Sequence, residues 1–248
     1  VPSYLNETLI ALIPKCQNPE SLSNYRPISL CNLIYKVISK IIVARIRPHL
    51  SSLISPVQTA FVPGQRGTDN VIIAQELFHT LDKKKKGRVG YMAIKLDLEK
   101  AYDRLEWSFV HKVLEAFRFP LKLTKIIMSC IATTSISVLV NGGALQSFEP
   151  SRGIRQGDPL SPYIFILCME YLGHLIKQKC VDGVWTPLKA SKNNVGILHL
   201  LFVDDILLFG KVDPAAYEAI LEVLGKFYAE SGQKISLEKS REIGRASC

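Results

Sequence analysis

The segment LHLLFVDDILLFG, Leu198–Gly210, most constrains the fold, because it places two adjacent acids between two strongly apolar runs. An unpaired charge is costly to bury in apolar surroundings. Asp204 and Asp205 must therefore be neutralised by a partner or stand at an exposed turn. The flanking runs 200–203 and 206–209 are each long enough for a short strand, so the segment predicts a tight hairpin with the acids at its tip.

Two interpretations of this acidic pair stay open from the residues alone. Aspartate tolerates turn conformations, so the pair could serve a purely structural turn. However, the turn contains no Gly or Asn, and one Asp would suffice where two occur. Adjacent like charges make ionisation costly, and a divalent cation removes that cost. Carboxylate oxygens are the ligands that Mg²⁺ selects, so a metal site is the alternative.

A third acid for such a site is Asp97, within YMAIKLDLEKAYD. Apolar residues at 92, 94, 96 and 98 alternate with the others, which is the period of a strand. The alternation puts Lys95 and Asp97 on the face opposite these aliphatics. Two metals bridged by carboxylates from separate elements activate an attacking oxygen and stabilise a leaving one. The three acids together would therefore indicate phosphoryl or nucleotidyl transfer.

Other patterns mix strands and helices without strict alternation. The segment 135–148, SISVLVNGGALQSF, predicts a hairpin with an Asn-Gly turn. Periodic apolar stripes predict one helix capped by Ser161 and another beginning after Asp213 and ending at Gly232. We therefore expect an α+β fold, an antiparallel sheet with helices packed on one face.

Composition narrows the class of protein. The 248 residues allow one large domain or two smaller ones, and 48% are hydrophobic, enough for a sizeable core. The formal charge of +9 favours an anionic partner, most often nucleic acid, although a plain basic soluble protein would carry it too. No apolar run approaches the roughly 20 residues of a membrane span.

Cysteines and the first residue add two expectations. The six cysteines form no CxxC pair, and several lie in apolar segments, so they read as small core side chains in a reducing compartment, cytosol or nucleus. The chain begins with Val1 rather than Met, which predicts that it starts inside a longer natural chain.

A series of motifs in a fixed order carries a resemblance to a known family. The motifs are ALIPK (11–15), NYRPISLCNLIYKVISK (24–40), QTAFVPGQRGTDN (58–70), IKLDLEKAYDRLEW (94–107), SVLVNG (137–142), RGIRQGDPLSPYIFILCMEYL (152–172), HLLFVDDILLF (199–209) and SGQKISLEKS (231–240). Together they resemble the reverse transcriptase domain of a non-LTR (LINE-type) retrotransposon, of the kind abundant in plant genomes.

The resemblance implies a right-hand polymerase fold with fingers and palm, the thumb missing. Residues 1–90 would form the fingers, 91–240 the palm with some fingers elements, and 241–248 a non-family tail. One departure lies in the acidic hairpin, where Val203 stands at a position that is Ala in most relatives. Because Val is β-branched and suits a strand entering a turn, we expect it to be tolerated.

The resemblance also assigns catalytic and metal-binding roles. Asp97 would be the first metal-binding aspartate, and Asp204 and Asp205 the paired acids of the hairpin. They would hold two Mg²⁺ ions, with Mn²⁺ as an alternative. Lys239 matches a lysine proposed to protonate the departing pyrophosphate, which is a reasonable role for a general acid.

Five further residues match positions that contact the nucleotide. Lys15 and Arg26 match fingers residues that grip the triphosphate, although either could be an ordinary surface cation. Tyr102 matches the aromatic that guards against a ribose 2′-hydroxyl; the alternative is a half-buried packing tyrosine. Gln156 and Gly157 match the motif along the incoming nucleotide and template, where Gly permits close backbone approach.

These matches imply an RNA-directed DNA polymerase that adds dNTPs to a DNA primer on an RNA template, in the nucleus or cytoplasm and without a membrane. The main alternative is a catalytically silent, nucleic-acid-binding relic of a retroelement. A second is an RNA-templated RNA polymerase or a nucleotidyl cyclase with a related palm, against which Tyr102 and the RQGDPLSP block argue. The sequence leaves the oligomeric state open.

Overall fold

The computed structural model describes residues 1–83, 90–191 and 195–245 and divides the chain into two compact units. The first unit joins Val1–Pro48 to Tyr102–Phe165, and the second joins His49–Ala101 to Ile166–Cys248. The division into compact units does not identify either unit as fingers or palm. The assignment of 1–90 to fingers and of 91–240 to palm with some fingers elements therefore stays a prediction.

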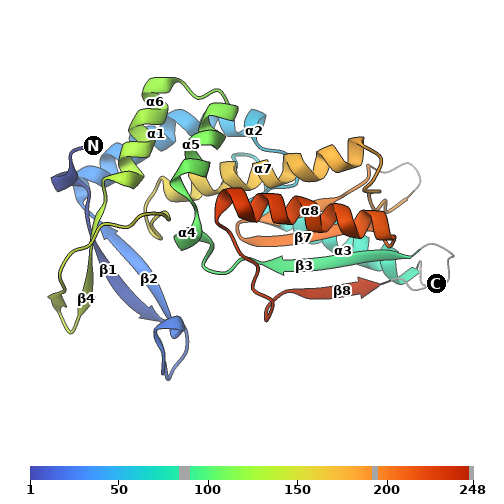
Figure 1. Cartoon of the computed structure of the whole chain (residues 1–248), viewed down its shortest axis with the longest axis horizontal. Helices are drawn as coiled ribbons and strands as arrows, with labels where there is room; N and C mark the ends of the chain where they lie inside the picture. Colours follow the sequence, from blue (N-terminus) through green and yellow to red (C-terminus); the bar gives the residue numbers. More distant parts are fainter. Residues whose placement is uncertain (84–89, 192–194, 246–248) are drawn as a thin grey trace. The chain divides into compact units, whose positions relative to one another are not determined.

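The first unit contains a four-stranded mixed sheet in the order β2-β1-β4-β5. Its strands are β1 (Glu7–Pro14), β2 (Tyr25–Cys31), β4 (Ser135–Val140) and β5 (Gly143–Ala144). β1 pairs antiparallel with β2 and parallel with β4 (Figure 1). The predicted hairpin in 135–148 is confirmed, since Asn141 and Gly142 turn with φ of 50° and 83° between β4 and β5.

The helices of the first unit supply its core. They are α1 (Leu33–Ile46), α5 (Trp107–Ala116) and α6 (Leu121–Ala132), with the short α4 (Ala101–Arg104) at the unit boundary and 3-10 turns at Ser3–Leu5 and Leu22–Asn24. Tyr35, Phe109 and Ile127 are completely or almost completely buried. Cys31 and Cys130 are buried free thiols, as predicted for small core side chains.

The second unit holds an antiparallel sheet in the order β6-β7-β3-β8 (Figure 1). Its strands are β3 (Tyr91–Asp97), β6 (His199–Phe202), β7 (Asp205–Lys211) and β8 (Arg241–Arg245). The predicted strand around Asp97 and the tight acidic hairpin are both confirmed. Residues 241–245 pair with β3 as β8, and 246–248 lie outside the described residues. The assignment of 241–248 to a non-family tail stays a prediction.

Helix α3 (Gly67–Lys83) packs on this second sheet. The other helices of this part of the chain are α7 (Ser161–Val181), α8 (Pro214–Ser231), the short α2 (Leu50–Leu53) and a 3-10 turn at Arg47–His49. Leu77 and Leu81 of α3 pack with Ala93 of β3 and Phe209 of β7 in one apolar cluster. None of the helices in the described part of the chain is long and apolar enough to span a bilayer.

Both faces of this antiparallel sheet carry buried side chains. Leu96 and Ile206 are directly opposite each other in the β3–β7 pair, on the face away from Ala93. They are only 6% and 0% exposed, so this second face is buried as well.

Helix ends follow the sequence signals at α8 and depart from them at α7. Asp213 caps α8 by accepting a hydrogen bond from the Ala216 amide at 2.9 Å, and Gly232 ends it with φ of 74°. At α7 the predicted cap Ser161 is already helical, and its buried Oγ has no hydrogen-bond partner. Asp158 instead accepts from the Leu160 amide just before the helix.

Candidate active site

Three carboxylates meet at one end of the second unit's sheet. Asp97 ends β3 and is the direct cross-strand partner of Asp205, which begins β7. Residues directly opposite in an antiparallel pair have Cβ atoms about 4.5–5.5 Å apart. The β6–β7 pairing runs up to Phe202 and Asp205, which leaves Asp204 in a two-residue turn beside them. Pairing register therefore joins acids that lie far apart in the sequence.

The turn that carries Asp204 is strained. Val203 has φ of 56°, in the left-handed region, where a residue with a side chain costs about 1–2 kcal/mol. Val203 stands in the turn itself and not in the strand that enters it, and a two-residue hairpin turn demands positive φ. Its tolerance here stays a prediction. Such strain persists only where the surroundings over-determine the conformation, and it concentrates at functional sites.

Two lysines lie against the acids. The Nζ of Lys95 is 2.7 Å from Asp205 Oδ1, and the Nζ of Lys239 is 3.7 Å from Asp97 Oδ1. Lys239 reaches the site because its loop is bound to β3: the Ser236 amide donates to the Asp97 carbonyl, and the Asp97 amide donates to Ser240 Oγ. Lys95 was not predicted as a site residue, although its spacing of two from Asp97 on a strand signals the same face.

The charges of the site act on one another. Burial first, and then the nearby carboxylates of Asp205 and Asp97, raise the pKa of Asp204 above its usual value. The hydrogen bond to Asp205 is the largest cause of the raised pKa of Lys95. The neighbouring carboxylates thus make the charged form of Asp204 costly, and a cation placed among them would relieve that cost, as in a set of divalent-metal ligands.

The donor chemistry fits Mg²⁺, but the ion pairs compete with it. Across residues 1–83, 90–191 and 195–245, no three carboxylate, imidazole or thiolate groups are arranged as a metal-binding cluster. Lys95 takes an oxygen of Asp205, although both side chains are nearly half exposed, at 40% and 47%. An exposed pair of this kind is worth only about 0–1 kcal/mol, so a divalent cation can displace the lysine.

The remaining predicted residues lie in the first unit, two of them on the β1–β2 hairpin. Arg26 is on β2, opposite Ile13, and is exposed. Lys15 directly follows β1; its exposed side chain donates to the Ser23 carbonyl at 2.8 Å. Both cations therefore lie near the tip of the same hairpin. The Arg26 side chain is exposed on β2, and the Lys15 side chain is bound to its own loop.

The Gln156-Gly157 dipeptide is docked on the same β2 strand. The Gln156 carbonyl accepts a hydrogen bond of 2.7 Å from the Ser29 amide. Gly157 has φ of 99°, and a Cβ there would lie 3.1 Å from the Ser29 carbonyl oxygen. Only glycine fits this approach without strain, as expected from the sequence.

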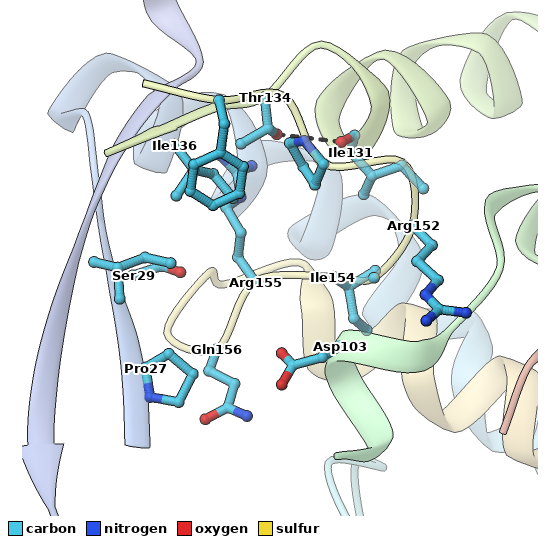
Figure 2. Close-up of a pocket in the computed structure, with 14 residues that line it drawn as sticks. Pro27, Ser29, Asp103, Ile131, Thr134, Ile136, Arg152, Ile154, Arg155 and Gln156 are labelled. Atoms are coloured by element: carbon cyan, nitrogen blue, oxygen red, sulfur yellow. Dashed lines mark hydrogen bonds between the residues drawn. The ribbon is translucent and has the colours of Figure 1, made fainter. Parts of the chain in front are cut away.

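A cavity of about 290 Å³ opens beside this dipeptide (Figure 2). Its walls are largely apolar, with Ile131, Ile136 and Ile154 among them. Asp103 and Gln156 add a carboxylate and an amide, and Figure 2 shows both side chains near the open lower part of the view. The cavity is thus largely apolar, with polar side chains that include Asp103 and Gln156.

Tyr102 lies in the same unit and is half-buried. Its ring stacks on Phe165, with centroids 4.9 Å apart and planes 14° from parallel. Its carbonyl accepts from the Ile154 amide at 2.8 Å, which ties α4 to the loop before Gln156. The structure therefore gathers Asp97, Asp204, Asp205 and Lys239 in the second unit, and Tyr102 and Gln156 in the first.

Nearly all of the chain is similar in sequence to known proteins. A family model described as reverse transcriptase (RNA-dependent DNA polymerase) matches residues 13–246, a range that includes β8. The chain is 26% identical over 240 residues to the transposon TX1 149 kDa protein of Xenopus laevis, which covers 97% of this chain and 18% of that protein. It is 25% identical to the Pol polyprotein of the retrotransposable element R2DM of Drosophila melanogaster, covering 98% and 22%.

Two other similarities concern a shorter segment and the fold. An uncharacterized mitochondrial protein of Arabidopsis thaliana, AtMg01250, is 48% identical over 67 residues, which is 27% of this chain and 55% of that protein. Telomerase from Candida albicans shares the fold, with a TM-score of 0.62 at 16% identity over 98% of this chain and 44% of that one.

The chain spans about a fifth of the length of the two transposon relatives. Its α+β fold is that of polymerase fingers and palm, with the antiparallel sheet described above. The family match covers all but its first twelve and last two residues. The chain therefore belongs to the reverse transcriptase (RNA-dependent DNA polymerase) family, and its relatives are retrotransposons of the non-LTR kind.

Proposed function

We propose that this chain is the core of an RNA-directed DNA polymerase, which adds dNTPs to a primer 3′-hydroxyl on an RNA template. The observation that carries the proposal is the register of the second sheet, with Asp97 opposite Asp205 and Asp204 in the adjoining turn. A structural turn needs one Asp at most, whereas three converging acids and a raised pKa at Asp204 fit metal-assisted nucleotidyl transfer.

Asp97, Asp204 and Asp205 would bind two Mg²⁺ ions, or Mn²⁺ in their place. When bound, the ions supply charge neutralisation for the attacking 3′-oxygen and the departing pyrophosphate. Lys95 holds one oxygen of Asp205 and would have to give it up for that carboxylate to serve as a metal ligand. Lys239, 3.7 Å from Asp97, gives a proton to the pyrophosphate as the bond to the α-phosphorus breaks.

The first unit would supply the nucleotide contacts. Lys15 and Arg26, exposed near one hairpin tip, grip the triphosphate as point charge and fork. Tyr102 lies under the sugar and excludes a 2′-hydroxyl by bulk. Gln156 and Gly157, held against β2, lie along the nucleotide and the template base.

We further assign residues 1–90 to fingers and 91–240 to palm, and the chain to a non-LTR retrotransposon of a plant. The 48% identity to the Arabidopsis protein over 67 residues supports a plant source. Three buried free thiols, Cys31, Cys130 and Cys168, suit a reducing compartment, nuclear or cytoplasmic.

Primer extension on an RNA template with Mg²⁺ tests the proposal. The parental chain should extend the primer, and Asp97→Asn should lose at least about a hundredfold in rate, since several kcal/mol of charge stabilisation is removed. Asp182→Asn, at an exposed site beyond α7, is the matched control and should extend at the parental rate. Template binding without extension by the parental chain would favour the silent relic instead.

Metal binding can be measured apart from activity. Electron paramagnetic resonance of added Mn²⁺ should show bound ions in the parental chain and fewer in Asp204→Asn, with Asp182→Asn again as control. Equal Mn²⁺ binding by all three proteins would remove Asp204 from the ligand set.

Sugar selection tests Tyr102 separately. Tyr102→Val should raise the use of a ribonucleotide relative to its deoxynucleotide, measured as the ratio of the two kcat/KM values. An unchanged ratio would leave Tyr102 as a packing residue on Phe165.

A further inference from the structure

A buried ion pair brackets the Gln156-Gly157 dipeptide. Arg155 precedes it and Asp158 follows it, and their side chains are joined at 2.9 Å. The two residues are only 7% and 2% exposed, whereas Gly157 between them is exposed. Figure 2 shows the Arg155 side chain running inward from the loop while Gln156 extends the opposite way. The dipeptide is therefore the outer part of a loop whose two flanks are fixed inside the unit.

Arg155 is held from several elements at once. Its guanidinium donates to Asn6 Oδ1 at 2.7 Å and to Thr8 Oγ1 at 2.9 Å, at the start of β1. It also donates to the Cys130 carbonyl at 3.1 Å, near the end of α6. Because the planar guanidinium donates hydrogen bonds in several directions at once, it has little freedom to shift.

Tyr35 of α1 completes the cluster. Its ring lies under the guanidinium, 4.1 Å from ring centroid to Cζ of Arg155. Its hydroxyl donates to Asp158 Oδ2 at 2.5 Å, and the other oxygen of Asp158 accepts from the Leu160 amide at 2.9 Å. Tyr35 is completely buried, and burial is the main reason that its pKa is raised, so the hydroxyl stays a donor.

A buried ion pair of this kind is weak evidence for a role in stability. Burying two charges has a desolvation cost that their attraction often only balances, and apolar residues of similar volume serve as well or better. What the cluster does provide is position, because charged hydrogen bonds are directional and apolar contacts are not. The position it fixes is that of a loop whose outer carbonyl also accepts from Ser29 of β2 at 2.7 Å.

We propose that Tyr35, Arg155 and Asp158 are positioning residues that hold the Gln156-Gly157 dipeptide where it meets the paired nucleotide and template. Tyr35 and Asp158 are 0% and 2% exposed, and Arg155, which lines the cavity, is only 7% exposed with its guanidinium bound within the unit, so we infer that they act through Gln156. The inference rests on the proposed polymerase function for its consequence, but the geometry it assigns to the loop is independent of that function.

Tyr35→Phe tests the inference with the smallest change, because it removes only the hydroxyl that contacts Asp158. A misplaced Gln156 should raise the KM for dNTP by about fivefold or more and change kcat less than about twofold, the pattern of lost substrate binding. Tyr171→Phe is the control: it deletes a similar hydrogen bond, from Tyr171 to Glu230 at 3.0 Å, in the other unit, and should leave KM unchanged.

A double variant separates positioning from a general structural effect. In a Gln156→Ala background the residue being positioned is absent, so adding Tyr35→Phe should change KM by less than about twofold. A full fivefold rise in that background would show that Tyr35 does not act through Gln156 and would overturn the inference. An unchanged KM in the single variant Tyr35→Phe would overturn it too.

A measurement without substrate keeps the inference testable if the parental chain fails to extend primers, which would refute only the proposed function. Hydrogen exchange of the Ser29 amide reports its bond to the Gln156 carbonyl. Exchange should be about fivefold faster or more in Tyr35→Phe, at a temperature where neither protein unfolds, and unchanged in Tyr171→Phe. Unaltered Ser29 exchange in Tyr35→Phe would mean that the cluster does not hold the loop.

Discussion

Gly153, in the loop before Gln156, packs against the backbone of Asp103 in α4, the helix that carries Tyr102. Its φ is 88°, and a Cβ there would lie 2.8 Å from the Asp103 carbonyl oxygen and 3.1 Å from the carbonyl carbon. Its amide donates to the Leu105 carbonyl at 2.8 Å, and its own carbonyl accepts from the Trp107 indole at 2.7 Å. Gly153→Ala should therefore disturb both the backbone conformation and the contact.

The expected cost has two parts. An alanine at positive φ costs about 1–2 kcal/mol. Relieving a 2.8 Å contact with backbone requires a shift that weakens the hydrogen bonds around it, at about 0.5–1.5 kcal/mol each. With the two hydrogen bonds named above, the sum is about 2–5 kcal/mol, or a fall in Tm of roughly 4–20 °C for a chain of this size.

Gly142→Ala separates the two parts. Gly142 has φ of 83°, nearly that of Gly153, but no heavy atom lies within 4 Å of its ideal Cβ. In urea unfolding, the free energy of unfolding should fall by about 1–2 kcal/mol in Gly142→Ala and by clearly more in Gly153→Ala. Equal losses would refute the argument that close backbone packing, and not φ alone, demands glycine beside Asp103.

Three further outcomes are expected. Val203→Asn should stabilise the chain by about 0.5–1 kcal/mol in urea unfolding, because Asn tolerates the left-handed φ of 56° found there; a loss would show that Val203 packing outweighs strain. Burial lowers the pKa of His199 to about 4, so its neutral form favours folding above pH 6.5 and that stability is lost as pH falls toward 4. Between pH 7.5 and 5.0 the loss should be about 2 kcal/mol, and His199→Gln should abolish it; a parental chain equally stable at both would contradict the burial. Lys95→Met should tighten Mn²⁺ binding in calorimetry, since the cation competing for Asp205 is gone; weaker binding would make Lys95 a supporting group.

Local patterns predicted much of the second sheet. Alternation around Asp97 and the apolar runs beside Asp204 gave the correct strands, and Asp213 and Gly232 marked the ends of α8. These signals lie within a few residues of the features they predict. Asp204 and Asp205 could be predicted as site residues because two adjacent like charges between apolar runs are costly unless a partner neutralises them.

Other features depended on partners that no local pattern contains. No local pattern signals that Arg155 is buried against Asn6 and Thr8, because these partners lie almost 150 positions earlier and only the fold joins them. The same holds for β8, which pairs with a strand about 150 positions earlier. Lys95 was overlooked because its partner Asp205 comes from another strand.

The position of β3 within its sheet has a consequence for biosynthesis. β3 bonds on one side to β7 and on the other to β8, both of which leave the ribosome more than a hundred residues after Asp97. A nascent chain that has reached only residue 198 therefore presents β3 with both edges unpaired, and exposed strand edges invite intermolecular association. Pairing between distant segments is also slow to form. Newly made chains should accordingly need chaperones until the final strand has emerged, and slowing translation after β3 should lower the soluble yield.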